Sequence, residues 1–256
     1  MSLAKWQAKY FIGGAAILPL APFLLVQGQI ARWKVGVLPG AAGATTGFAG
    51  NGDADAAKLF VIGESTVAGL GARTHETGLA GQFAKQLSLR IDGPVSWRVV
   101  GKNGVTARRT IDELLPQMPD EQFDYILVGL GGNDVMRLSS PKRWRRDMTE
   151  LLSTLREKSP DAAIFLSNCP MIKMSPAIPH PTKAILWQLS RMHDANIREF
   201  TGKMEKVFYY PQPADVPLEG FFADGIHPSE QGYSDWSAAM MKYFDQHHEW
   251  QNHKPK

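Results

Sequence analysis

The chain has 256 residues, of which 44% are hydrophobic, 10% aromatic and 21% charged. This composition excludes a disordered chain and suffices for one buried α/β core of about 200 residues. A single cysteine, Cys169, excludes a disulfide framework and a cysteine-based zinc cluster. Residues 1–52 hold four basic and no acidic side chains, and the remaining 204 hold 24 Lys and Arg against 25 Asp and Glu. Because this body is nearly neutral, we expect no nucleic-acid partner.

The N-terminal residues 1–34 are predicted to be a hydrophobic anchor or a signal-like segment. Residues 10–26 contain no charged side chain and would span about 26 Å as a helix, close to the hydrocarbon thickness of a membrane. The helix is interrupted by Pro19 and Pro22, which membranes tolerate. Aromatic and basic residues flank the stretch, as is typical of membrane interfaces: Trp6, Trp33, Lys5, Lys9, Arg32 and Lys34.

Three interpretations of this segment stay open: a single membrane span, a cleaved signal peptide, and a helix packed on the following domain. Length and flanking residues favour the span, and no small-x-small cleavage site follows directly, because Gln27-Gly28-Gln29 comes next. The protein is therefore expected to be anchored or exported. Two basic residues lie on each side of the apolar stretch, so the charges do not select the side of the membrane on which the domain lies.

The rest of the chain divides into a linker, a domain and a tail. Residues 35–56 are rich in Gly and Ala without periodicity and are predicted to be a linker; a polar tail is expected at 248–256. Between them, strand-like and helix-like segments alternate over 57–247, which predicts an α/β fold with a five-stranded parallel sheet covered on both faces. The expected strands are 58–63, 95–100, 123–130, 162–167 and 206–210, and the expected helices are 78–89, 110–117, 141–158, 182–204 and 229–247.

The ligand site of such a sheet lies beyond the carboxyl ends of its strands. After the first expected strand, Ser65 stands in GESTVAG (63–69), at a turn suited to a nucleophile or to a helix cap. Val67 occupies the second glycine position of a G-x-S-x-G elbow, which argues against the α/β-hydrolase fold. After the third strand, Asn133 in LGGND (130–134) offers an amide donor or belongs to an ordinary turn.

A third motif, DGIHP (224–228), lies near the C-terminus and leads into the last expected helix. An aspartate three residues before a histidine, as Asp224 is before His227, can fold back and accept a hydrogen bond from the imidazole. The alternative is an Asp-Gly turn followed by a proline at a helix start.

The three motifs, in this order and spacing, resemble blocks I, III and V of the SGNH (GDSL-type) hydrolases. The resemblance covers residues 57–247 and implies a flavodoxin-like three-layer α/β/α sandwich, ester or thioester hydrolysis, and neither a metal nor a cofactor. Carried over by position, it implies that Ser65 is the nucleophile, His227 the general base and Asp224 its orienting carboxylate. Asn133 matches the side-chain donor of the oxyanion hole.

Two positions depart from the family pattern. Glu64 stands where the family usually has aspartate, at a position that shapes the loop and is not part of the triad. The family's oxyanion glycine has no direct counterpart: alignment on the Gly-Val-Thr core puts Ala107 there, with Gly104 as the alternative. Since this donor is a backbone N–H, alanine can serve where its backbone angles permit. The oxyanion hole is thus expected from the amide of Ser65, that of Ala107 or Gly104, and the side chain of Asn133.

The resemblance implies a serine hydrolase that cleaves carboxylic esters, of small-acyl or lysophospholipid type, through an acyl-enzyme. The alternative enzymes on the same triad are a carbohydrate acetyl esterase and an acyl-thioesterase. An alternative that is not an enzyme is a catalytically silent acyl- or glycan-binding module. The expected partners are a small-molecule or lipid ester and, through residues 1–34, a membrane; the oligomeric state is not determined.

Two further sequence features each have two possible interpretations. Met171 and Met174 follow the fourth expected strand and either line an acyl pocket or belong to a loop packed on the core. The basic cluster at 142–146 is either a contact for anionic lipid or the solvated start of a helix.

Overall fold

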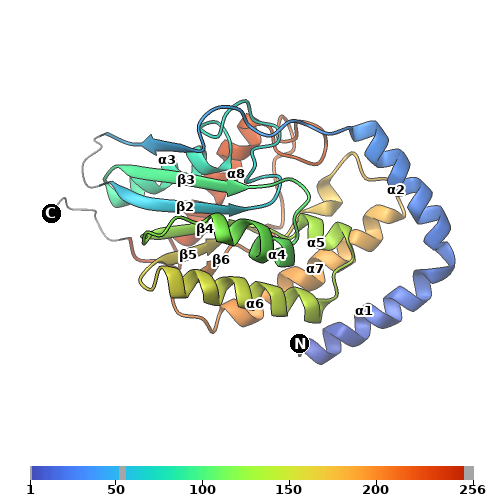
Figure 1. Cartoon of the computed structure of the whole chain (residues 1–256). Coiled ribbons are helices and arrows are strands. Elements are labelled where there is room, and N and C mark those ends of the chain that lie inside the picture. The colour runs from blue at the N-terminus through green and yellow to red at the C-terminus, as the bar shows by residue number, and fades with distance from the viewer. Residues whose placement is uncertain (1, 52–55, 251–256) are drawn as a thin grey trace.

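A six-stranded sheet forms the centre of the computed structural model, which describes residues 2–51 and 56–250 (Figure 1). Its strand order is β1-β3-β2-β4-β5-β6. All strands run parallel except β1, which pairs antiparallel with β3 at one edge. The five predicted strands and their parallel arrangement are confirmed, as β2 (Ala57–Gly63), β3 (Val95–Gly101), β4 (Tyr125–Gly129), β5 (Ala163–Leu166) and β6 (Val207–Tyr209).

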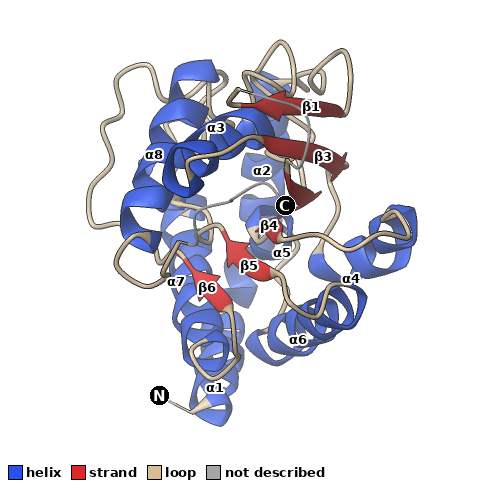
Figure 2. Cartoon of the chain, turned by 90° about the vertical axis from the view of Figure 1, so that its left-hand side faces the viewer, coloured by secondary structure: helices blue, strands red, loops and turns tan. Residues whose placement is uncertain are grey.

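Helices cover both faces of the sheet, and each face has its own hydrophobic core (Figure 2). Alternate residues of β2 point to opposite faces, as the two-residue period of a strand requires. Phe60 and Ile62 pack with α6 (Pro141–Lys158) and α7 (Thr182–Thr201), whereas Leu59 and Val61 pack with α3 (Leu79–Ile91) and α8 (Glu230–Phe244). Burial on both faces explains why β2 is an almost continuous apolar run, and the three layers match the predicted α/β/α sandwich.

The predicted helix at 110–117 is irregular in the structure. It consists of α4 (Ala107–Arg109), a π-helical turn η2 (Thr110–Leu114) and a 3₁₀ turn η3 (Leu115–Gln117). Pro116 lies in η3, where its missing N–H prevents a regular continuation of the α-helix. Two short elements lie outside the predicted set, α5 (Gly132–Met136) and η4 (Ile172–Met174).

The predicted linker is part of the fold. Residues 46–49 form β1 (Thr46–Ala49), paired with β3, and the backbone N–H groups of Ala41 and Ala42 donate to the carbonyls of Ala68 and Arg73. Gly/Ala-rich composition therefore does not mark a free tether here, because this segment gains its order from the sheet edge and from the loop after β2.

The predicted polar tail also differs, since its first residues pack on the domain. The rings of His248 and Phe208 are 4.8 Å apart, and those of Trp250 and Phe165 are 5.7 Å apart. The indole N–H of Trp250 donates to Asp245 at 2.8 Å. The remainder of that predicted tail, 251–256, lies outside the described residues.

The N-terminal segment forms two helices, α1 (Leu3–Ile17) and α2 (Ala21–Val35), joined by the 3₁₀ turn η1 (Leu18–Leu20). Pro19 and Pro22 lie at this junction, where proline breaks the helical hydrogen bonding. The predicted span at 10–26 is therefore helical but bent, and it arches along one side of the domain (Figure 1). The whole stretch Leu3–Val35 is long and apolar enough to cross a membrane, and none of it is buried.

Polar side chains fasten this arch to the domain at both ends. The Tyr10 hydroxyl donates to the Leu138 carbonyl at 2.6 Å, and the Gln7 side chain accepts from the Lys142 backbone N–H at 2.9 Å. At the other end, the Gln27 amide donates to the His180 carbonyl at 2.7 Å. Both helices therefore have a fixed position on the domain.

A serine caps the last helix, α8, and is expected to stabilise the fold. The Ser229 hydroxyl accepts from the Gly232 N–H at 3.0 Å and donates to the Gly220 carbonyl. We expect Ser229→Ala to lower the free energy of unfolding by about 1 kcal/mol, as for other N-cap serines, measured by urea unfolding. Ser229→Thr keeps both functions of the hydroxyl and should be near wild type; an equal loss in both variants would contradict the cap.

Candidate active site

The first motif lies directly beyond the carboxyl end of β2, a central strand of the sheet that pairs with β3 and β4. The backbone turns sharply there: the N–H groups of Val67 and Ala68 both donate to the Glu64 carbonyl at 2.9 Å, and that of Leu70 donates to the Ser65 carbonyl at 3.0 Å. Ser65 is buried, and its side chain lines a cavity at this edge of the sheet. This is the sheet edge at which the sequence predicts a ligand site.

The third motif brings Asp224 and His227 into contact. One carboxylate oxygen of Asp224 accepts from the backbone N–H groups of Ile226 and His227, at 2.9 and 2.7 Å. The other lies 2.7 Å from Nδ1 of His227. Partial burial raises the pKa of the Asp224 carboxyl, but the hydrogen bonds from His227 and Ile226 outweigh it and hold the pKa below its usual value. Because an ionised carboxylate only accepts, Nδ1 carries the hydrogen and Nε2 is left as an acceptor.

Tight contacts hold the His227 loop against the Ser65 loop. Gly71 has φ +93°, and a Cβ at this position would lie 2.1 Å from the Pro228 carbonyl, so only glycine permits the approach. Nearby, Glu230 accepts from the Arg73 backbone and guanidinium, both at 3.0 Å. These bonds with Arg73 lower the pKa of the Glu230 carboxyl to about 2. The Tyr233 hydroxyl adds a bond of 2.7 Å to the Leu70 carbonyl.

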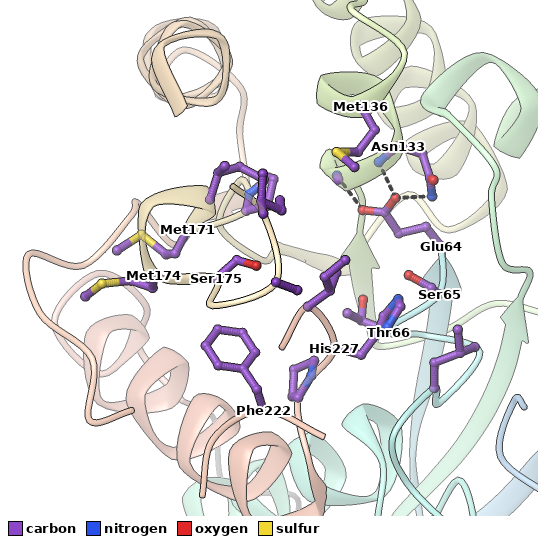
Figure 3. Close-up of a pocket in the computed structure, with 18 of the residues that line it drawn as sticks. Glu64, Ser65, Thr66, Asn133, Met136, Met171, Met174, Ser175, Phe222 and His227 are labelled. Atoms are coloured by element: carbon purple, nitrogen blue, oxygen red, sulfur yellow. Dashed lines mark hydrogen bonds between the residues drawn. The ribbon is translucent and has the colours of Figure 1, made fainter. Parts of the chain in front are cut away.

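The two loops meet at a cavity of ≈ 970 Å³ (Figure 3). Its lining includes three of the predicted site residues, Ser65, Asn133 and His227, and also Gly104; Asp224 lies behind His227 and does not line it. Within the described part of the chain, no hydrogen bond joins the Ser65 hydroxyl to the His227 ring. The backbone N–H groups of Ser65 and Gly104 have no acceptor among those residues either.

Glu64 connects the first motif with the second, a role that the sequence did not predict. Its buried carboxylate accepts from the backbone N–H groups of Gly132 and Asn133, at 2.6 and 2.7 Å, and from the Asn133 side-chain amide at 2.5 Å (Figure 3). Burial raises the pKa of the Glu64 carboxyl to about 7, although these hydrogen bonds act in the opposite direction. The departure from the usual aspartate was the only signal of this contact in the sequence.

Glu64 leaves part of the Asn133 amide available. A side-chain amide has two N–H groups, and the carboxylate occupies one of them. The other N–H has no acceptor among the described residues, and Asn133 lines the cavity.

The structure corrects the prediction for Ala107. Its backbone N–H donates to the buried Asp134 carboxylate at 2.8 Å, and Ala107 is fully buried away from the cavity. The physical reason is that Ala107 is the first residue of α4, where a backbone N–H has no acceptor within the helix, and the side chain of Asp134 on α5 accepts from it. The alternative, Gly104, has φ +81° and lines the cavity, so Gly104 is the better placed of the two amides.

The loop after β5 supplies apolar lining. Met171 and Met174 both line the cavity, as one of the two sequence interpretations held. Cys169 is buried outside the lining, and burial raises the pKa of its thiol. Among residues 2–51 and 56–250, no group of three or more His, Cys, Asp or Glu side chains is placed to hold a metal ion.

The basic cluster is largely engaged in ion pairs. Arg143 and Arg146 flank the buried Asp147 carboxylate at 3.6 and 2.8 Å, and Arg145 bonds to Glu199 at 2.8 Å. This pattern agrees with the solvated start of a helix.

Comparisons with known proteins agree with this architecture. The lipase from a goat rumen metagenome has a TM-score of 0.57 at 15% identity, over 76% of this chain and 98% of that one. An acetyl xylan esterase from Butyrivibrio proteoclasticus has a TM-score of 0.55 at 16% identity, over 77% of this chain and 66% of that one. A family two carbohydrate esterase from Clostridium thermocellum, in complex with cellohexaose, has a TM-score of 0.54 at 14% identity, over 77% of this chain and 66% of that one.

At 14–16% identity, the similarity to these three structures shows that the chain shares their fold. Comparison with curated protein sequences gave no match. Residues 61–234 match the sequence profile of the GDSL-like lipase/acylhydrolase family, and they include all three motifs. The predicted resemblance is confirmed, and the chain belongs to the GDSL-like lipase/acylhydrolase family of esterases.

Proposed function

We propose that this protein hydrolyses carboxylic esters, with Ser65 as nucleophile, His227 as general base and Asp224 as its orienting carboxylate. The observation that carries the proposal is the pair formed by Asp224 and His227, 2.7 Å apart, at the cavity that Ser65 lines. Simple binding does not need a base oriented by a carboxylate at a cavity that a serine side chain lines. This argument favours an enzyme over a silent binding module.

In the first step, Ser65 Oγ attacks the ester carbonyl while His227 Nε2 takes its proton. The ionised Asp224 stabilises the imidazolium that forms. The tetrahedral oxygen receives hydrogen bonds from the amides of Ser65 and Gly104 and from the free N–H of Asn133, each worth about 3–4 kcal/mol in the transition state. His227 then protonates the leaving alcohol, and an acyl group remains on Ser65.

In the second step, water attacks the acyl-enzyme and gives its proton to His227 Nε2. The same three donors stabilise the second tetrahedral intermediate. Its collapse returns the proton to Ser65 Oγ and releases the carboxylic acid, so that one ester and one water give one alcohol and one acid.

A fluorophosphonate probe tests the nucleophile directly. We expect the full-length protein to be labelled at Ser65, located by peptide mass spectrometry, because the phosphorus centre reacts with an activated serine. Labelling should vanish in Ser65→Ala and become much slower in His227→Ala. A folded protein that neither reacts with the probe nor cleaves p-nitrophenyl acetate or butyrate would refute the proposal and favour the binding module.

Acetyl ester removal from a polysaccharide is the second candidate activity. It is supported by the fold likeness to an acetyl xylan esterase and to a carbohydrate esterase. Hydrolysis of acetylated xylan, measured beside p-nitrophenyl esters, separates it from a general carboxylesterase.

We also propose that residues 1–34 attach the enzyme to a membrane. The support is the apolar helical stretch Leu3–Val35, whose large side chains are exposed, among them Phe11, Ile12, Leu18 and Trp33. Exposed apolar surface of this extent is typical of a membrane contact.

A further inference from the structure

We infer that α2 forms one wall of the acyl-binding part of the active site, and that the substrate is an ester with a medium or long acyl chain. The inference rests on the proposed ester hydrolysis at Ser65 and adds the substrate class and the residues that select it.

One face of α2 lines the cavity. Gly28, Ala31, Arg32 and Val35 are lining residues, and their spacing of three and four residues places them on a single face of the helix. The lining continues through residues 36–38, directly after α2. The N-terminal segment is therefore part of the cavity that contains Ser65, although these lining residues lie 27 to 37 positions before Ser65 in the sequence.

The inward face of α2 leaves room for a ligand. Gly28 has no side chain, and a Cβ built there meets no atom within 4 Å. Ala31 adds only a methyl group. Small residues on a cavity-facing helix leave the volume of the cavity open next to the helix backbone.

Several other parts of the lining are apolar, although the cavity also has polar and charged lining residues such as Arg32, Arg109 and Asp215. The loop after β5 and the start of α7 contribute Met171, Met174, Ile178 and Leu186, and the loop before Asp224 contributes Leu218 and Phe222. A volume of ≈ 970 Å³ lies at the upper end of the range of about 300–1,000 Å³ that is typical of small-molecule sites. An acetyl group would occupy a small part of it, whereas a longer acyl chain would contact these walls and be removed from water.

The position of α2 is fixed by one of its polar side chains. The Gln27 side chain donates to the His180 carbonyl at 2.7 Å and accepts from the Thr182 hydroxyl at 2.5 Å. These bonds fasten α2 to the N-terminus of α7. A segment that served only as a tether would not need such contacts.

The outward face of α2 offers the chain a route into the cavity. Phe23, Val26, Ile30 and Trp33 are exposed, with Trp33 82% exposed, and the helical period places them opposite the lining residues. When this face contacts a membrane, the cavity on the other side of α2 lies close to the hydrocarbon. An acyl chain then passes from the bilayer to Ser65 with little exposure to water.

Two glycines provide a matched test in the full-length protein. Gly28 lines the cavity, whereas Gly13 on α1 does not, and neither position has an atom within 4 Å of an added Cβ. Both lie in exposed helices, where phenylalanine has a higher helix propensity than glycine. Gly28→Phe places a ring in the acyl space, and Gly13→Phe adds the same ring elsewhere on the N-terminal segment.

The readout is the ratio of kcat/KM for p-nitrophenyl dodecanoate to that for the acetate, in the same detergent micelles. We expect Gly28→Phe to lower this ratio by at least about tenfold, because the ring displaces several methylene groups of the long chain. Ala31→Trp should act in the same direction, and Gly13→Phe should keep the wild-type ratio. Since a ratio is compared, a lower fraction of folded enzyme does not imitate the effect.

Two results would overturn the inference while leaving the proposed hydrolysis intact. One is Ser65-dependent acetate hydrolysis without dodecanoate hydrolysis in the wild type. The other is an unchanged ratio in both Gly28→Phe and Ala31→Trp. Absence of any Ser65-dependent hydrolysis would instead refute the proposed function, and the inference with it.

Discussion

Replacing Ser65 or His227 by alanine is expected to lower kcat for p-nitrophenyl butyrate by about 10⁶-fold, and replacing both should lower it no further. The two side chains act in one proton transfer, so loss of either removes the whole step. Steady-state kinetics of the two single variants and the double variant check this non-additivity, with circular dichroism as the control for folding. A Ser65→Ala enzyme that keeps more than about 1% of the activity would show that another residue is the nucleophile.

Replacing Asp224 is expected to lower kcat by less than replacing Ser65 or His227. In Asp224→Asn, the side-chain oxygen can still accept from the N–H groups of Ile226 and His227, so the loop keeps its turn. The amide N–H would instead face Nδ1 of His227 and favour the tautomer with hydrogen on Nε2, which cannot act as base. We expect a loss of about 10⁴-fold in kcat, smaller than that of the alanine variants.

The sequence predicted the parts of the fold that local patterns determine. β2 and β4 are short apolar runs because they are buried on both faces of the sheet. The motifs with Ser65, Asn133 and His227 were located because the carboxyl ends of parallel strands meet at one edge. In the same way the helix expected at 141–158 is present as α6, which begins at Pro141 and is capped by Ser140.

Such local patterns did not predict contacts between segments that are distant in sequence. β1 has no periodicity of its own and exists through its pairing with β3. The Ala107 amide was assigned from alignment alone, which does not reveal that Asp134 accepts from it. The wall formed by α2 depends on contacts of Gln27 with residues more than 150 positions away.

Replacing Glu64 is expected to have the second large effect on kcat. The sequence marked this residue as a departure from the family pattern, and the structure shows which groups it contacts. Its carboxylate orients Asn133 through both the backbone and the side chain of that residue. In Glu64→Gln, an NH₂ group replaces one of the two carboxylate oxygens, so that either the Gly132 N–H or the N–H groups of Asn133 lose their acceptor. We expect kcat to fall by about 10²–10³-fold, the usual cost of an impaired oxyanion donor. KM should change little, because this donor acts mainly in the transition state.

Glu64→Asp is the matched control for this positioning role. It keeps a carboxylate and restores the residue usual in the family at this position. Activity closer to wild type in Glu64→Asp than in Glu64→Gln would support orientation of Asn133 by the negative charge. Equal losses of kcat in the two variants would instead indicate that the length of the side chain is what matters.

The raised pKa of Glu64 also predicts how stability depends on pH. Its folded-state pKa of about 7 lies above the usual value of 4.5, so the folded protein holds this proton more tightly than the unfolded chain. The resulting stabilisation is fully present below pH 4.5 and is lost as pH rises through 7, a change on the order of 3 kcal/mol. Urea unfolding between pH 4.5 and 8 gives the free energy of unfolding of both proteins as a function of pH. As pH rises, this free energy should fall more in the wild type than in Glu64→Gln, because the glutamine side chain has no proton to lose. Parallel curves for the two proteins would mean that Glu64 titrates near its usual pKa and that the Asn133 loop donates its hydrogen bonds to an ordinary carboxylate.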